Sequence, residues 1–156
     1  MTDMPRISVV MCVFNDAEHI GAAIASILGQ TYSDFELIVI DDGSQDETPR
    51  VISQFADRRI EVVRNEINLG LTKSLNLGFR RARGCYIARH DADDISRAER
   101  FAYQVEYLDS HINCAVVGSA YELIHDDASL NRIQYMPTEP DEIRDMLFYH
   151  HCLCHG

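Results

Sequence analysis

The sequence predicts an α/β protein whose mostly parallel sheet is covered by helices. Nearly continuous apolar runs alternate with segments of helical periodicity, which is the pattern of parallel strands joined by helices. The runs at 7–14 and 35–40 are rich in β-branched residues, as expected for central strands buried on both faces. A chain of 156 residues is long enough for one domain with a sizeable core, which we place at residues 1–156.

Three shorter apolar segments, at 60–63, 85–88 and 115–117, are further strand candidates. After Ser119 the pattern weakens. The polar stretch 125–131 predicts a loop or hairpin tip, and 139–148 predicts a short helix. The final residues resemble a core segment that stops abruptly, so we expect a C-terminally truncated chain.

Four helices are predicted from apolar residues that recur with the spacing of one helical face. Asn15 or Asp16 can cap the first helix, and capping-box patterns at 44–47 and 96–99 predict the starts of the second and fourth. Gly84 is expected to end the third. The four apolar stripes are Ile20, Ile24, Ile27 and Leu28; Thr48, Val51, Ile52 and Phe55; Leu71, Leu75, Phe79 and Ala82; and Phe101, Val105 and Leu108.

The formal net charge of −11 disfavours binding to nucleic acid or to anionic lipid. An acidic protein that binds a phosphate ester needs a cation or a local basic group to hold it. No apolar run approaches the roughly 20 residues of a membrane span, and the N-terminus has no signal-peptide pattern. The odd count of five cysteines favours free thiols in a reducing compartment. We therefore expect a cytoplasmic location.

Four polar clusters, at 14–16, 41–44, 68–70 and 91–94, follow four predicted strands. Ligands of such sheets bind outside the carboxyl ends of the strands. The convergence of four polar segments at one edge therefore predicts a binding site there.

The cluster Asp91-Ala92-Asp93-Asp94 contains three carboxylates within four residues, which repel one another unless a cation is present. Mg²⁺ and Mn²⁺ prefer oxygen ligands, often one or two carboxylates together with substrate phosphates. These residues are therefore candidate metal ligands. A solvated acidic turn that caps the next helix would show the same pattern.

The cluster Asp41-Asp42-Gly43-Ser44 fits a tight turn in which Ser44 caps the following helix. That interpretation leaves two adjacent aspartates unexplained, and one carboxylate could accept a hydrogen bond from the ring N–H of a uracil. The sequence contains neither a Walker phosphate loop nor a Gly-x-Gly-x-x-Gly after a strand, which disfavours ATP-driven and dinucleotide chemistry of those classes. The cysteines and histidines of 150–155 lack the spacing of a standard zinc site.

Four sequence segments stand out as motifs: 7–16 (ISVVMCVFND), 26–44 (SILGQTYSDFELIVIDDGS), 68–78 (NLGLTKSLNLG) and 86–100 (YIARHDADDISRAER). Together, in their order and at their spacing, they resemble the family-2 glycosyltransferases. The resemblance implies the A-type glycosyltransferase fold, a Rossmann-like sheet. It implies a nucleotide-sugar donor, often UDP-linked, and transfer to an acceptor hydroxyl with inversion at the anomeric carbon. It also implies Mn²⁺ or Mg²⁺, and a saccharide or lipid-linked acceptor in cell-envelope polysaccharide synthesis at the inner face of the membrane.

Carried over by position, Cys12 and Phe14 would line the base pocket, and Asp42 rather than Asp41 would hydrogen-bond the base. Asp91 would face the ribose or the metal, and Asp93 would be the principal metal ligand.

Further residues follow from the same resemblance. Arg100 would brace the metal loop, and His155 is a further metal or diphosphate candidate. Many relatives carry arginine where this chain has Leu75, and Lys73 could supply the missing positive charge. The general base of the family would lie beyond Gly156, so none is named and the acceptor-binding portion is expected to be incomplete.

Two other functions fit the same residues. A nucleotidyltransferase shares the sheet and the acidic metal site, but it usually has a basic, glycine-rich loop where this chain has the acidic Phe14-Asn15-Asp16. A non-catalytic module that binds nucleotide-sugars would need no general base. In the simplest alternative, the acidic loops of an α/β domain are merely solvated.

Overall fold

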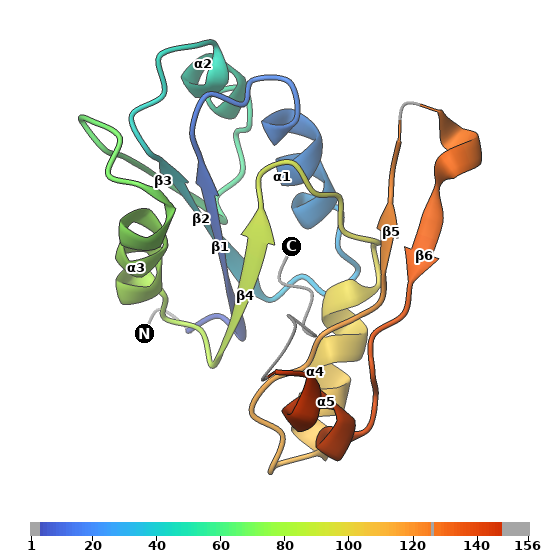
Figure 1. Ribbon diagram of the computed structural model, residues 1–156. Helices are drawn as coiled ribbons and strands as arrows, with labels where there is room; N and C mark the ends of the chain where they lie inside the picture. Colours follow the sequence, from blue (N-terminus) through green and yellow to red (C-terminus); the bar gives the residue numbers. More distant parts are fainter. Residues whose placement is uncertain (1–3, 126, 148–156) are drawn as a thin grey trace. The chain divides into compact units, whose positions relative to one another are not determined.

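The computed structural model describes residues 4–125 and 127–147 (Figure 1). The chain divides into two compact units that adjoin in sequence at Ala102 and Tyr103. The single domain of residues 1–156 stays a prediction.

The first unit is built on a four-stranded parallel sheet. Its strands are β1 (Ile7–Val13), β2 (Phe35–Asp41), β3 (Ile60–Arg64) and β4 (Tyr86–Asp91), in the order β3-β2-β1-β4. β1 pairs with β2 and β4, and the register sets Cys12 opposite both Ile40 and Asp91. Because all pairings are parallel, the carboxyl ends of the four strands lie at one edge. The four strands predicted from the apolar runs up to residue 88 are confirmed.

β1 and β2 form the centre of the core because both faces of these strands are covered. Every residue of β2 is buried, and so is every residue of β1 except Cys12. α1 (Ile20–Leu28) and α2 (Thr48–Ile52) contact each other on one face, and α3 (Leu71–Arg81) packs against β1 and β2 on the other (Figure 1). This is the arrangement that right-handed crossover connections produce.

Three predicted helix caps are wrong in detail. α1 begins at Ile20 after His19 and has no side-chain cap. α2 begins at Thr48, whose N–H is accepted by Asp46 and not by Ser44. α4 (Arg100–Ser110) begins four residues after Ser96. Ser44 instead joins the turn after β2 to the Asn15 backbone, and Ser96 contacts the side chains of His90 and Arg100, because tertiary partners compete with the local helix ends for the same oxygens.

Gly84 does not end α3 as predicted, because the helix ends at Arg81 with Ala82 as its C-cap. Gly84 instead lies against β1, where its N–H donates to Ser8 Oγ at 2.8 Å. A Cβ on Gly84 would lie 2.5 Å from the backbone nitrogen of Ser8. The glycine is required by this close backbone approach.

A buried carboxylate fixes the same corner of the sheet. Glu36 of β2 is 6% exposed, and it accepts hydrogen bonds from Ser8 Oγ at 2.6 Å and from the backbone and side chain of Arg83. Burial opposes ionisation of Glu36, but these donors outweigh it and hold its pKa below the usual value. The segment before β4 is thereby tied to the two central strands.

The second unit contains an antiparallel hairpin of β5 (Tyr121–Leu123) and β6 (Arg132–Gln134). A 3₁₀ turn, η1 (Ala128–Leu130), lies between the two strands, and α5 (Pro140–Met146) follows them. The hairpin tip and the short helix predicted after Ser119 are therefore confirmed.

The predicted strand at 115–117 is wrong, since residues 114–120 form neither helix nor strand. Val116 is 61% exposed, and a β-branched residue favours a strand chiefly where a neighbouring strand gives it packing. No helix of the described residues is long and apolar enough to cross a bilayer.

We expect Gly84→Ala to lower the free energy of unfolding by about 1–3 kcal/mol, because the methyl group would force the backbone of β1 and the 83–84 segment apart. Chemical denaturation measures the change. Cys85→Ser, at the exposed neighbouring position, is the control and should change stability by no more than about 0.5 kcal/mol. Equal effects of the two variants would contradict the role given to Gly84.

Candidate functional site

An open pocket of about 250 Å³ lies at the carboxyl edge of the parallel sheet. The end of β1, the end of β4 and the first residue of α3 contribute to it. Residues of the predicted polar clusters 14–16 and 91–94 line the pocket, and Leu71 directly follows the cluster 68–70. Its lining residues are Cys12, Val13, Phe14, Asp16, Leu71, Arg89, Asp91, Ala92 and Asp93.

A larger hollow of about 530 Å³ lies at the opposite edge and is lined by Ser33 and residues 56–59. It contains an Arg59–Asp57 ion pair but none of the residues predicted to bind a ligand. Chemistry rather than size therefore favours the pocket at the carboxyl edge.

The two acidic residues predicted to bind a metal both line this pocket. Asp91 is the last residue of β4 and its side chain is 35% exposed, while Asp93 is exposed in the turn that follows. No group of three histidine, cysteine or acidic side chains that could hold a metal ion is found in the part of the chain that the structure describes. Two carboxylates that share a divalent ion with ligand phosphates suit the oxygen preference of Mg²⁺ or Mn²⁺.

Arg89 brings a positive charge into the pocket and was missed by the sequence analysis. Its Nη2 lies 2.8 Å from Oδ1 and 3.2 Å from Oδ2 of Asp91. Residues two apart on a strand point to the same face, so the spacing of Arg89 and Asp91 is the signal that could have revealed it.

His90 holds the backbone of the acidic turn from the other face of β4. It is 1% exposed, and its Nδ1 lies 2.7 Å from the carbonyl oxygen of Asp91. A carbonyl only accepts, so Nδ1 carries the proton and Nε2 accepts from the Ser96 hydroxyl at 3.0 Å. Burial, together with the charge of Arg100, lowers the pKa of His90 to about 4, so the ring is neutral at pH 7.

Arg100 braces the same turn at a second point. Its Nη1 donates to Ser96 Oγ at 2.9 Å, and its Nη2 donates to the carbonyl oxygen of Arg89 at 3.3 Å. These contacts connect the start of α4 to β4 on either side of the acidic turn.

Asp42 is a buried anchor and does not line the pocket. It is 4% exposed. Its Oδ1 accepts from Asn65 Nδ2 at 2.7 Å, from Ser74 Oγ at 2.8 Å and from the Leu69 backbone at 2.9 Å, and its Oδ2 accepts from the Gly70 backbone at 2.9 Å. Burial opposes ionisation, but the four donors outweigh it and hold the pKa of Asp42 below its usual value. The predicted hydrogen bond from the N–H of a base to Asp42 stays a prediction.

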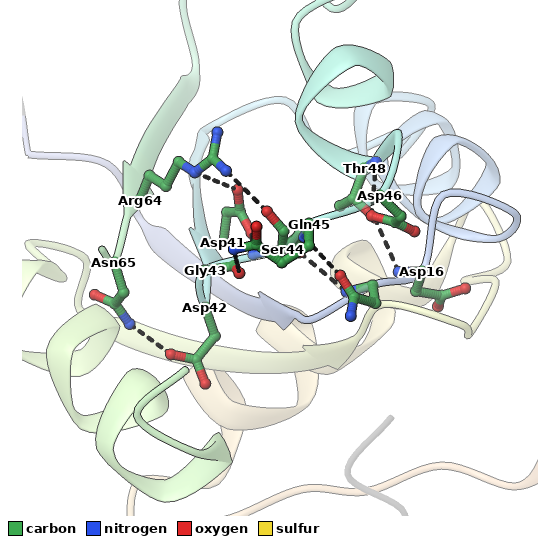
Figure 2. A network of polar contacts seen from close by, with 11 residues as sticks. Asp16, Asp41, Asp42, Gly43, Ser44, Gln45, Asp46, Thr48, Arg64 and Asn65 are labelled. Carbon is green, nitrogen blue, oxygen red and sulfur yellow. Dashed lines mark hydrogen bonds and ion pairs between the residues drawn. The ribbon is translucent and has the colours of Figure 1, made fainter. Parts of the chain in front are cut away.

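Asp41 points away from Asp42, toward Arg64 (Figure 2). Its Oδ1 accepts from the Ser44 backbone at 2.9 Å, and its Oδ2 forms an ion pair with Arg64 Nε at 3.3 Å. Gly43 between these residues has a φ of 79°, and a Cβ there would lie 2.7 Å from the carbonyl carbon of Ile67. The turn after β2 therefore requires glycine for its conformation and for the approach of the 67–70 loop.

The loop that carries Phe14 is fastened to the turn after β2 (Figure 2). The Asn15 N–H donates to Ser44 Oγ at 3.0 Å, and Asn15 Oδ1 accepts from the Gln45 N–H at 2.7 Å. Asn15 adopts a φ of 52°, a left-handed conformation that asparagine tolerates better than most residues. This clamp fixes the backbone beside Phe14, whose side chain lines the pocket and is 45% exposed.

The remaining predicted residues divide into two groups. Cys12 lines the pocket, where burial and then the charge of Asp42 raise its pKa to about 12, so its thiol is neutral at pH 7. Lys73 is exposed on α3 and is not among the lining residues. His155 lies outside the described residues.

Residues 8–155 match the family described as glycosyl transferase family 2. The chain belongs to glycosyl transferase family 2. A curated relative in Escherichia coli, the UDP-Glc:alpha-D-GlcNAc-diphosphoundecaprenol beta-1,3-glucosyltransferase WfgD, is 32% identical over 126 residues, which cover 81% of this chain and 49% of the relative. This chain spans about half or less of the length of three curated relatives that it matches, with 39%, 51% and 49% of each covered.

Two solved structures confirm the predicted fold class. S. aureus TarS 1–349 in complex with UDP has a TM-score of 0.65 at 25% identity, over 69% of this chain and 33% of that one. The mannosyltransferase PcManGT from Pyrobaculum calidifontis, in complex with GDP-Man and Mn²⁺, has a TM-score of 0.65 at 27% identity, over 78% of this chain and 37% of that one. The parallel sheet of this family member is therefore the A-type glycosyltransferase fold that its sequence motifs imply.

We expect Asp42→Asn to lower the free energy of unfolding at pH 7 by roughly 2–4 kcal/mol, because an amide cannot accept from all four donors around a buried carboxylate. A carboxyl with a depressed pKa stabilises the fold above its unfolded pKa, and that contribution is lost as pH falls through the folded value. Denaturation at several pH values should therefore show the gap between variant and wild type closing below about pH 4. A gap independent of pH would contradict this role.

Proposed function

We propose that this chain is the donor-binding part of a glycosyltransferase that transfers a sugar from a nucleoside diphosphate, with UDP as the favoured nucleotide, to an acceptor hydroxyl with inversion and with the help of Mn²⁺ or Mg²⁺. One observation carries the proposal. The paired carboxylates Asp91 and Asp93 line the same pocket as Cys12 and Phe14, at the carboxyl edge of the sheet of a family-2 member.

The charge of the protein explains why a metal belongs in this proposal. A nucleoside diphosphate is an anion, and this chain has a formal net charge of −11. Asp91 and Asp93 would hold a divalent ion that in turn binds the diphosphate. When bound, such an ion stabilises the negative charge on the departing nucleoside diphosphate as a Lewis acid.

The other lining residues orient the donor. The exposed ring of Phe14 and the neutral thiol of Cys12 offer an apolar surface for the base, and Leu71 extends it from the first residue of α3. The backbone around these residues is fixed by the Asn15 clamp and by the Asp42 anchor, so the pocket is largely formed before a ligand binds. Pre-formed sites lose less entropy on binding. None of the carboxylates in the pocket is assigned the role of catalytic base.

The names of the similar proteins support the choice of donor. WfgD is named for a UDP-Glc donor and a diphosphoundecaprenol-linked acceptor, one TarS structure contains UDP, and PcManGT contains GDP-Man with Mn²⁺. By analogy we propose a lipid-linked or saccharide acceptor, a role in cell-envelope polysaccharide synthesis, and a cytoplasmic location at the inner face of the membrane.

A non-catalytic module that binds nucleotide-sugars is the second candidate. The observation in its favour is that two of the carboxylates that line the pocket, Asp16 and Asp91, are paired with His19 and Arg89, and the third, Asp93, is assigned to the metal. Turnover of a nucleotide-sugar by the full-length gene product separates the two candidates, because both bind the donor and only the transferase consumes it. A nucleotidyltransferase has lost its support, since the family is that of glycosyl transfer and the loop after β1 is acidic.

We expect Asp93→Ala to reduce the affinity for UDP in the presence of Mn²⁺ by about tenfold or more, because the metal loses a carboxylate ligand. UDP affinity without metal should change little. Isothermal titration calorimetry with UDP, with and without Mn²⁺, measures both quantities, and a parallel titration with GDP tests the choice of nucleotide. Glu99→Ala, which removes an exposed carboxylate that does not line the pocket, is the matched control. Unchanged affinity in Asp93→Ala would remove Asp93 from the metal site.

A further inference from the structure

The three carboxylates that line the pocket differ in their partners. Asp16 Oδ1 lies 2.6 Å from His19 Nδ1, and Asp91 pairs with Arg89. Within residues 4–125 and 127–147, no ion pair involves Asp93. Among the described residues that line this pocket, Arg89 is the one arginine. Its guanidinium pairs with Asp91 and not with Asp93.

The Arg89 side chain is held between the sheet and the pocket. It is 26% exposed, and its Nε is a buried atom without a hydrogen-bond partner among the described residues. Only Nη2 of the guanidinium donates to Asp91, to both carboxylate oxygens. The charge of Arg89 is therefore directed at Asp91 rather than shared among several acids.

A fixed positive charge beside Asp91 has two physical consequences. It orients the carboxylate, because one nitrogen contacts both oxygens. It also opposes a second cation at the same oxygens, and this repulsion is strong over a few ångströms in a partly buried site. Asp93 experiences neither effect through a direct contact.

We propose that Arg89 is a positioning residue of the donor site: it holds the Asp91 carboxylate in one orientation and compensates its charge, and in this way it sets how tightly that carboxylate binds the divalent ion that it shares with Asp93. The inference rests on the proposed function, since it assigns a role to a further residue of that site. It accounts for an arginine in a pocket whose other charged lining residues are all aspartates.

The test measures Mn²⁺ binding to the chain by electron paramagnetic resonance, and UDP binding in the presence of Mn²⁺ by calorimetry. The variants are Arg89→Met, Arg89→Lys, Asp91→Asn and the double variant Arg89→Met/Asp91→Asn. Arg81→Met is the matched control, because Arg81 also pairs with a carboxylate, that of Glu61, and does not line the pocket. Thermal unfolding checks that each variant is folded.

Arg89→Met should bind Mn²⁺ about threefold or more tightly than wild type, because Asp91 becomes an uncompensated anion. The same variant should bind UDP about fivefold or more weakly, because Asp91 is no longer held in place. Arg89→Lys should keep Mn²⁺ affinity near that of wild type, since the charge remains. In the Asp91→Asn background, Arg89→Met should cause no further loss of UDP affinity, as expected when one residue acts through the other.

If Arg89 had only a structural role, Arg89→Met would lower the affinities for Mn²⁺ and for UDP together. This result would overturn the inference. Additive losses of UDP affinity in the double variant would overturn it as well, because they would mean that Arg89 contacts the diphosphate directly. Failure of the wild-type chain to bind UDP with or without Mn²⁺ would overturn the proposed function and this inference with it. Binding by wild type with unchanged affinities in Arg89→Met would overturn the inference alone.

Discussion

The parallel pairing of β1 with its two neighbours is the constraint from which the site follows. In a parallel sheet all strands end at the same edge, so segments distant in sequence are brought together there. The register places Cys12 of β1 opposite Asp91 of β4, and the two residues line one pocket. The apolar character of β1 and β2 keeps both strands in the centre of the sheet, which fixes this edge.

Most carboxylates at that edge have a defined hydrogen-bond or ion-pair partner. Asp42 is surrounded by four hydrogen-bond donors, Asp41 faces Arg64, and Asp91 faces Arg89. The four donors hold the pKa of Asp42 below its usual value, and the arginines hold the side chains of Asp41 and Asp91 in place. These partners offset the repulsion between the carboxylates. The loops near the pocket can therefore stay folded although they carry several acidic residues.

Local patterns predicted the elements well and their ends poorly. Apolar runs located four parallel strands, and helical spacing located α1 and α3, because burial dictates these periods directly. The predictions that Ser44 and Ser96 cap helices were wrong because their hydroxyl groups form hydrogen bonds elsewhere, with the Asn15 backbone and with the His90 ring. The segment 115–117 has the composition of a strand, but composition alone could not show that it lacks a neighbouring strand.

The sequence by itself determined the fold class and the family, and its motif spacing predicted that Cys12, Phe14, Asp91 and Asp93 lie close together. Only the tertiary structure decided which acids reach the pocket. Asp42 turns inward because Asn65, Ser74 and the 69–70 backbone converge on it, while Arg89 turns toward Asp91. Such choices depend on partners far apart in the chain, which a local pattern does not contain.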